Sequence, residues 1–356
     1  LLDEPTAVLS PVETIELYRT LRRLASEGAT IAVVTHRLDE VLRYCDHVTV
    51  MRRGAGVLDR PLPRADTDTI STEELRAELT RAIMGGDPPA AATPPDRDDA
   101  AKVMLELKEI STASSDGRPT LTGVSLALRA GEILGVAGIE GNGQSEIVRA
   151  LAGLAPLATG RIDLDGQVLF DSARATASSD RSAAVRSARS RGLMTVHEDR
   201  HRDEMLGEAS VADNLVLGDL DAVDEPAAIE RRFGRFKVSP PNPQRRADEL
   251  SGGNQQKVVM ARALDRPLKA LVLAQPTRGV DIGTARTIHH AIAKAASDGA
   301  AVLLLSADLN ELRSLSHRLI VLHRGQIAAH LDPTASDETI GRAMLGSDNE
   351  DEEDGA

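Results

Sequence analysis

An internal repeat constrains the fold of this chain more than any other feature of its sequence. Residues 1–54 align with residues 272–325 without a gap, and 12 of these 54 positions are identical, among them Pro5-Thr6 with Pro276-Thr277. A repeat of this kind indicates that one structural unit occurs twice. We therefore expect residues 1–85 to be the C-terminal remainder of one domain, and residues 103–346 to be a complete second copy of it.

The segments outside the two copies differ from them in composition. Residues 86–102 are rich in Pro, Ala and Asp, which predicts a semi-rigid linker. The last ten residues, 347–356, hold six acidic side chains and predict a disordered tail. Ser172–Ser190, rich in Ser, Ala and Arg, predicts a surface insertion or a loosely packed helix. Because the chain does not begin with Met, we expect a fragment whose first domain starts upstream of Leu1.

Apolar runs alternate with helical patterns in the second copy. Ile133–Ala137, Leu271–Leu273 and Val302–Leu305 are short and unbroken, as in parallel strands that are covered on both faces. Ser145–Leu154 and Ala285–Ser297 have the apolar spacing of helices. This alternation predicts an α/β fold built on a parallel sheet.

Composition excludes several classes of function. The net charge is −13 and only five of the 356 residues are aromatic, whereas nucleic-acid binding needs clustered Lys and Arg or aromatic stacking platforms. No apolar run approaches the ~20 residues of a membrane span. Cys45 is the one cysteine, so an internal disulfide is impossible and a reducing compartment fits best. From the net charge and the scarcity of aromatic residues we expect no nucleic-acid partner.

A glycine-rich string connects a predicted strand to a predicted helix. It reads Gly138-Ile139-Glu140-Gly141-Asn142-Gly143-Gln144-Ser145. Glycines at such a point let backbone N–H groups surround phosphate oxygens, and the helix N-terminus adds partial positive charge. The Lys that usually follows the last glycine is replaced by Gln144, while Ser145 keeps a hydroxyl for Mg²⁺. Taken alone, such a loop is often only a turn before a helix.

A second string precedes another apolar helix pattern, and it reads Leu250-Ser251-Gly252-Gly253-Asn254-Gln255-Gln256-Lys257. Ser251 can cap that helix, and the two glycines allow a ligand to approach the backbone closely. This string closely resembles the signature of the ABC transporter ATPases, and its longer form resembles the branch that imports simple sugars or nucleosides. Members of that branch carry two fused ATPase domains, as the repeat requires. The strings Glu198-Asp199-Arg200-His201 and Ala274-Gln275-Pro276-Thr277-Arg278-Gly279 also resemble that branch and lean toward its purine-nucleoside importers.

The resemblance implies a P-loop NTPase of the ABC type, with ATP and Mg²⁺ as cofactors. In the first copy it assigns Asp3 to hydrated Mg²⁺, Glu4 to the attacking water and His36 to sensing the γ-phosphate. Members of the family bind each ATP between the Walker motifs of one domain and the signature of the other. The residues expected to face the same nucleotide are therefore Ser251, Gly252, Gly253 and Gln255. Those expected to face a second nucleotide are Gly138, Gly141, Asn142, Gly143, Gln144 and Ser145, with Ser145 at its Mg²⁺.

The second copy lacks the catalytic groups of the first. Four of its positions have lost the required chemistry: Ala274 for Asp3, Gln275 for Glu4, Ala307 for His36 and Gln144 for the loop Lys. Loss of a general base alone costs about 10²–10⁴ in rate. We therefore expect a degenerate second site that hardly hydrolyses ATP. Residues 1–356 alone are expected to be inactive, because the phosphate loop of the competent site would lie upstream of Leu1.

The resemblance also implies a transport function. We expect an ATP-binding and ATP-hydrolysing subunit of an importer for a simple sugar or nucleoside, which works with two membrane permease subunits and an extracytoplasmic solute-binding protein. Such a subunit would be peripheral on the cytoplasmic face of the cell membrane, held there only through the permeases. The alternative is a soluble ABC ATPase of the translation-factor type, which should have a long charged helical linker and intact catalytic groups in both halves.

One further string matches a different enzyme class. His197-Glu198-Asp199-Arg200-His201 fits H-E-x-x-H, the pattern of zinc metalloproteases. That chemistry needs both histidines on one helix face and a third ligand. The string follows the strand-like Leu193–Val196 and shows no helical periodicity. We therefore expect a loop of the ABC family here, which usually has Pro in place of His197, rather than a zinc site. His289 and His290 are expected on a helix surface.

Overall fold

The computed structural model describes most of the chain, namely residues 1–6, 9, 11–35, 37–52, 54–63, 71–87, 90–113, 119–174, 181–219 and 225–346. It divides into two compact units, 1–91 with 281–286, and 92–280 with 287–356. The division falls inside the predicted linker, and Pro95 already belongs to the second unit, where its carbonyl accepts a hydrogen bond from His317 Nε2 at 2.6 Å. His36 and the predicted tail lie outside the described residues.

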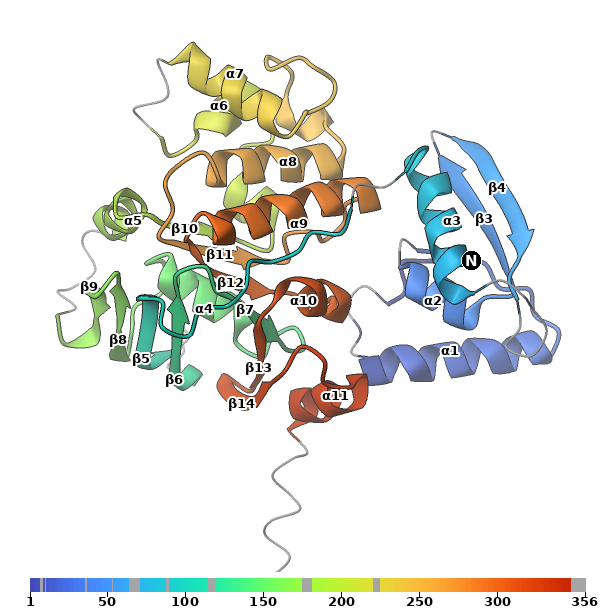
Figure 1. The fold of residues 1–356 in the computed structure, drawn as a ribbon, viewed down its shortest axis with the longest axis horizontal. Helices are drawn as coiled ribbons and strands as arrows, with labels where there is room; N and C mark the ends of the chain where they lie inside the picture. The colour runs from blue at the N-terminus through green and yellow to red at the C-terminus, as the bar shows by residue number, and fades with distance from the viewer. Residues whose placement is uncertain are drawn as a thin grey trace, which may run out of the picture. The chain divides into compact units, whose positions relative to one another are not determined.

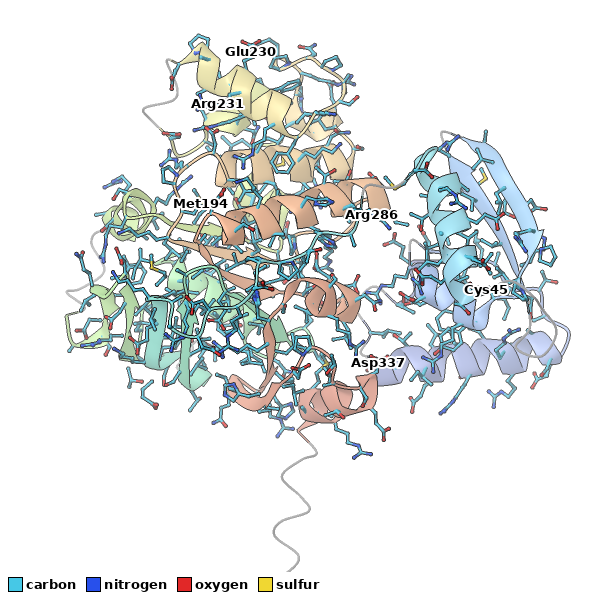
Figure 2. All side chains as sticks on the ribbon, viewed as in Figure 1. Cys45, Met194, Glu230, Arg231, Arg286 and Asp337 are labelled. Atoms are coloured by element: carbon cyan, nitrogen blue, oxygen red, sulfur yellow. The ribbon has the colours of Figure 1, made fainter. Side chains whose placement is uncertain are left out.

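The first unit is built from short elements: β1 Leu2–Asp3, α1 Pro11–Ser26, β2 Val33–Val34, α2 Leu38–Tyr44, β3 His47–Arg52, β4 Ala55–Pro61 and α3 Thr72–Met84. β1 pairs with β2 in parallel, and β3 pairs with β4 antiparallel. Ser71 and Glu74 form a capping box at the start of α3, which satisfies two backbone donors reciprocally. A small core of Val41, Val50, Leu62, Leu75 and Leu79 holds these elements together. Cys45 lies partly buried beside this core (Figure 2), and burial raises the pKa of its thiol.

The second unit holds the longer elements. Its strands are β5 Val103–Ala113, β6 Pro119–Arg129, β7 Ile133–Ala137, β8 Thr159–Leu164, β9 Gln167–Asp171, β10 Leu193–Val196, β11 Ala270–Ala274, β12 Ala301–Leu305, β13 Arg318–His323 and β14 Gln326–Leu331. Its helices are α4 Gln144–Leu151, α5 Arg181–Ser190, α6 Val211–Val216, α7 Pro226–Arg235, α8 Gly252–Ala263, α9 Ile282–Ser297 from residue 287 on, α10 Leu309–Leu315 and α11 Asp337–Leu345. Short turns of 3₁₀ type occur at Ser172–Arg174 and Ala247–Glu249, and a π-helical turn occurs at Arg200–Glu204.

A parallel sheet organises this unit. Within the described residues, six strands pair in the order β10-β11-β12-β7-β13-β14, and only β14 at the edge runs antiparallel. Side chains along β11 alternate between two cores, with Leu271 and Leu273 on the side of α8 and α9, and Val272 on the side of α4. Figure 1 shows α8 and α9 along one side of the sheet, with α6 and α7 stacked beyond α8. Coverage of both faces explains the unbroken apolar runs of the sequence, and it confirms the predicted α/β class.

A smaller antiparallel sheet completes the unit. In the described part of the chain its strands pair in the order β6-β5-β8-β9. Its apolar side chains, including Leu105, Leu107 and Ile162, share one core with α4 and the parallel sheet. In the predicted insertion Ser172–Ser190, the described part contains α5, which packs against β10.

The repeat is preserved in three dimensions within each unit. Leu2 pairs with Val33 between β1 and β2, and the equivalent Leu273 pairs with Leu304 between β11 and β12. Environment is what differs, because Val34 is 54% exposed whereas its equivalent Leu305 is 1% exposed. The same strand register therefore serves as an exposed pair in one unit and as the centre of a sheet in the other.

A buried glutamate anchors each copy at an equivalent place. In the first unit, the Thr6 hydroxyl donates to Glu40 Oε2 at 2.9 Å, and the Tyr18 hydroxyl donates to the same oxygen at 2.8 Å. Burial and this carboxylate raise the pKa of Tyr18. Glu40 thereby ties the turn after β1 to α1 and α2.

The second unit repeats this arrangement with one change of side chain. The Thr277 hydroxyl donates to Glu311 Oε1 at 2.8 Å, and His289 Nε2 lies 2.9 Å from the same oxygen. His289 therefore stands where the first unit has Tyr18. The expectation that His289 is a surface residue is wrong, because its ring turns toward a carboxylate that only the tertiary fold brings to α9.

We predict that Glu311→Ala lowers the free energy of unfolding by about 1–3 kcal/mol, because the Thr277 hydroxyl and His289 lose a buried acceptor. Glu338→Ala is the matched control, since that side chain is 74% exposed on α11, and it should change stability by no more than about 0.5 kcal/mol. Urea unfolding followed by circular dichroism measures both. Equal losses for the two variants would contradict a structural role for Glu311.

Candidate functional site

The order of the parallel sheet brings four loops to one edge. β10, β11, β12 and β7 are neighbours and run in the same direction, so the loops after them emerge together at their carboxyl ends. Ligand sites of open α/β sheets form at this edge. Three strings that the sequence singles out, at 138–145, 197–201 and 274–279, lie at the ends of these strands, and Ala307 follows β12.

The glycine-rich loop after β7 has a backbone that other residues tolerate poorly. Gly141 and Gly143 have φ angles of +91° and +110°. A side chain at Gly138 is also excluded, because a Cβ there would lie 2.3 Å from Gln144 Nε2 and 3.1 Å from the Leu322 carbonyl oxygen. The loop therefore has the geometry of a phosphate cradle, with the first turn of α4 at its end.

Gln144 occupies the inside of this cradle. Its Nε2 donates to the Ile139 carbonyl at 3.1 Å, while its Oε1 is buried without a hydrogen-bond partner. The Ser145 hydroxyl donates to the carboxylate of Glu198, which also forms an ion pair with Arg278. Burial raises the pKa of Glu198, and Arg278 opposes this rise. The cradle thus presents a neutral amide at Gln144, and the carboxylate beside Ser145 is paired with an arginine.

Asn142 connects the glycine-rich loop to another turn. Its Oδ1 accepts a hydrogen bond from the Arg324 backbone N–H at 3.1 Å, and its carbonyl accepts one from Gly325 at 3.0 Å. The side chain therefore fastens the glycine-rich loop to the turn between β13 and β14. The contact of Asn142 with a nucleotide stays a prediction.

The residue after β1 and its equivalent after β11 share an uncommon backbone conformation. Glu4 has φ +43° and Gln275 has φ +50°, in the left-handed region that side chains rarely adopt. Both N–H groups donate to the neighbouring parallel strand at 2.8 Å, to the Val34 carbonyl in one copy and to the Leu305 carbonyl in the other. Strained backbone of this kind clusters at functional sites. The fold therefore preserves the same site geometry in both copies.

The side chains at these equivalent positions differ in chemistry. Asp3 and Glu4 are exposed carboxylates at the end of β1. Gln275 instead accepts a hydrogen bond from the Ala307 backbone N–H at 3.1 Å, which joins the loops after β11 and β12 through a neutral amide. The acids that could act on a bound phosphate are therefore present in the first unit and absent from the equivalent positions of the second.

The glycines of the second string begin α8. Ser251 stands at the N-cap with φ −62° and ψ 153°, but its side chain accepts no backbone hydrogen bond and instead accepts one from Asn254 Nδ2 at 3.0 Å. The predicted side-chain cap is therefore not formed. Ser251 is exposed and Gly252 is partly exposed, whereas Gly253 is buried.

Gln255 points into the protein rather than outward. It is 4% exposed, and both ends of its amide are bonded, since Oε1 accepts from Arg200 Nε at 3.2 Å and Nε2 donates to the Ala247 carbonyl at 3.2 Å. The contact of Gln255 with a nucleotide stays a prediction, while both ends of its amide are already bonded within the protein. Gln255 supports the first turn of α8 from inside.

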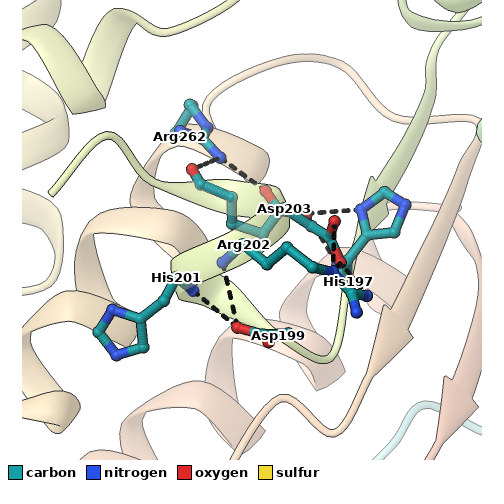
Figure 3. Close-up of polar contacts among 7 residues, drawn as sticks. His197, Asp199, His201, Arg202, Asp203 and Arg262 are labelled. Atoms are coloured by element: carbon teal, nitrogen blue, oxygen red, sulfur yellow. Dashed lines mark hydrogen bonds and ion pairs between the residues drawn. The ribbon is translucent and has the colours of Figure 1, made fainter.

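The two histidines of the H-E-x-x-H string do not form a metal site. The His197 N–H and Nδ1 both meet Glu204 Oε1, at 2.7 and 2.8 Å, whereas the His201 ring points away from them (Figure 3). The sequence showed no helical periodicity here, yet Arg200–Glu204 forms a π-helical turn that Asp199 caps. His197 precedes that turn, so the histidines share no face. No group of three potential metal ligands occurs among the described His, Cys, Asp and Glu residues.

The string is instead fastened to α8 by a buried ion pair. Arg262 Nη2 contacts Glu204 Oε2 at 2.6 Å (Figure 3), and its Nη1 donates to the Asn214 carbonyl at 3.1 Å. Burial lowers the pKa of Arg262. Because the His197 N–H donates to Glu204, Pro at position 197 would remove a donor from this network. One signal for the ion pair is visible in the sequence, namely the position of Arg262 among the apolar residues Val258–Ala263.

Known proteins resemble this chain in sequence over most of its length. The family model described as ABC transporter matches residues 121–278. The nucleoside import ATP-binding protein NupA of Lactococcus lactis subsp. cremoris is 35% identical, over 97% of this chain and 67% of its own length. The ribose import ATP-binding protein RbsA of Chromobacterium violaceum is 34% identical, over 97% and 66%. The glucose import ATP-binding protein TsgD13 of Haloferax volcanii is 35% identical, over 97% and 62%.

Solved structures agree on the fold. The ATP-binding subunit of an ABC transporter superposes with a TM-score of 0.56 at 19% identity, over 68% of this chain and 99% of that one. A bacterial ABC transporter cassette superposes with a TM-score of 0.54 at 20% identity, over 65% and 100%. No described helix has the length and apolar character of a membrane span. The chain spans about two thirds of the length of the curated relatives named above, and it belongs to the ATP-binding proteins of the ABC transporter family.

Proposed function

We propose that this chain is the ATP-binding and ATP-hydrolysing part of an ABC importer for a simple sugar or nucleoside. The three relatives named above are import ATP-binding proteins for a nucleoside, ribose and glucose. The observation that carries the proposal is the division of chemistry between the copies. Asp3 and Glu4 stand at a strained strand end in one copy, and an intact signature begins α8 in the other.

In this proposal each copy supplies its own groups for ATP hydrolysis. In the first copy, Asp3 holds hydrated Mg²⁺, Glu4 polarises the attacking water as a general base, and His36 senses the γ-phosphate. In the second copy, Ser251, Gly252 and Gly253 supply a hydroxyl and backbone N–H groups to ATP. Exposed carboxylates suit Mg²⁺, which prefers oxygen ligands.

The glycine-rich loop of the second unit forms a degenerate site in this proposal. Its backbone fits a phosphate, but Gln144 brings no charge, and the nearby Arg278 is engaged in an ion pair with Glu198 beside Ser145. The strand-end positions Ala274, Gln275 and Ala307 provide neither an acid nor a sensing histidine. Nucleotide at this loop would therefore be bound weakly and hardly hydrolysed.

We further propose the partners and the location that follow from import. Two membrane permease subunits would carry the solute, and an extracytoplasmic solute-binding protein would deliver it. The chain would be peripheral on the cytoplasmic face of the membrane, attached only through the permeases. Because the net charge is −13, we propose no nucleic-acid partner.

The asymmetry between the copies can be tested in the complete subunit with its permeases. We predict that Glu4→Gln lowers the rate of ATP hydrolysis by about 10²–10⁴, because the general base is lost. Gln275→Glu should leave the rate nearly unchanged, since the acid it restores stands in a site without Lys and without the Mg²⁺ acid. Phosphate release measures both. Comparable losses from Glu4→Gln and from changes at Gln144 would overturn the assignment of one competent site.

The charge deficit of the glycine-rich loop gives a second test. We predict that Gln144→Lys raises the affinity of residues 1–356 for ATP about 10- to 100-fold, because a charged hydrogen bond to phosphate replaces a neutral one. Gln167→Lys is the matched control, since it adds the same charge at the exposed first residue of β9. Isothermal titration calorimetry measures both affinities. A gain no larger for Gln144→Lys than for the control would show that this loop does not receive phosphate.

A further inference from the structure

Arg200 reaches from the loop after β10 to the first turn of α8. Its Nε donates to Gln255 Oε1 at 3.2 Å, and its Nη1 donates to the Arg278 carbonyl at 3.1 Å. One guanidinium thereby joins the signature helix to the loop after β11. The planar fork of an arginine suits this task, because its donors diverge in fixed directions toward separate acceptors.

The same guanidinium lies against the signature glycine. A Cβ on Gly252 would lie 2.6 Å from Arg200 Nη2 and 3.1 Å from the Gly279 carbonyl oxygen. Any larger residue at position 252 would displace the arginine or the backbone of the neighbouring loop. A side chain at position 252 would therefore disturb the contacts of Arg200 on the inner side of α8.

The base of this contact is itself held in place. Asp199 Oδ1 accepts hydrogen bonds from the N–H groups of His201 and Arg202 at 3.1 Å, which fixes the turn that carries Arg200. At the other end of the turn, Glu204 is bound by Arg262. The turn is thus attached to α8 at Gln255 and again two helical turns later at Arg262, so its position and that of α8 are coupled.

We propose that Arg200 is a positioning residue for the signature, which holds Gly252 and Gln255 from inside so that Ser251 and the backbone of the first turn of α8 are presented to ATP. The inference deepens the proposed function and rests on its assignment of the signature to the competent site. Arg200 acts through the helix and touches no reacting atom. Loss of Arg200 should therefore lower the rate of ATP hydrolysis more than it weakens the initial binding of nucleotide.

This assignment differs from a coupling role for the loop at residues 197–201. In a coupling role the loop would contact a permease, and changes in it would separate ATP hydrolysis from transport. The Arg200 side chain instead turns toward Gln255 and the Arg278 carbonyl, is partly buried, and has its pKa lowered by that burial. Arg202, two residues on, is 68% exposed and pairs only locally with Asp203 in the bonds described.

The test compares Arg200→Ala, Arg200→Lys and the control Arg202→Ala in the complete subunit assembled with its permeases. Arg200→Ala should lower kcat for ATP hydrolysis about 10- to 100-fold with a smaller change in KM. The reason is that a small displacement of the signature groups that contact ATP is costly for the rate of reaction. Arg200→Lys should recover part of the rate, since an ammonium reaches one acceptor but not both. Arg202→Ala should hydrolyse ATP at the wild-type rate.

A double-mutant cycle separates positioning from general stability. If Arg200 acts through Gln255, the losses in kcat from Arg200→Ala and Gln255→Ala should overlap rather than multiply. Circular dichroism checks that each variant is folded, and Arg200→Lys keeps the test valid if Arg200→Ala does not fold. Wild-type hydrolysis with lost transport in folded Arg200→Lys would overturn the proposal in favour of a coupling role. Wild-type rates of both hydrolysis and transport in folded Arg200→Ala would also overturn the proposal, because the side chain would then have no positioning role. Failure of the proposed function is separate, because it would appear as undiminished hydrolysis in Glu4→Gln.

Discussion

The parallel pairing of β10, β11, β12 and β7 is the constraint on which the rest of the second unit depends. Parallel strands end on the same side, so four loops that are far apart in the sequence meet at one edge. The pairing also buries both faces of the sheet, with α4 on one side and α8 and α9 on the other. The glycine-rich cradle, the strand-end Gln275 and the turn that carries Arg200 are all placed by this one arrangement.

The two copies share a local scaffold although their exposed side chains differ. Both retain the left-handed residue after the strand and the buried glutamate that receives a threonine hydroxyl. These features stabilise the local fold whatever the exposed side chains are, because an unpaired buried carboxylate would be costly. The exposed acid, by contrast, contributes chemistry and little stability, so Gln275 can replace the residue equivalent to Glu4 without disturbing the fold.

Helix α8 links these observations to function. Its first residues are the signature glycines, and its inward face carries Gln255 and Arg262, which are bonded to the turn between residues 199 and 204. A buried arginine with a carboxylate partner does not by itself indicate high stability, since desolvation offsets much of the attraction. It does define a single register between two segments. That is what a helix needs if its N-terminus is to meet a ligand at a defined position.

The sequence alone determined the class of fold, the repeat, the glycine-rich cradle, the location of the acids and the family. All of these depend on local patterns, such as unbroken apolar runs, glycines before a helix and strings of adjacent residues, which are visible without knowing what lies nearby. The tertiary structure decided the roles of Asn142, Gln255 and His289, and it revealed Arg200. Each of these polar side chains meets a partner brought from a distant segment by the sheet order. A polar residue turns inward only when such a partner is there to satisfy it, and no local pattern records that.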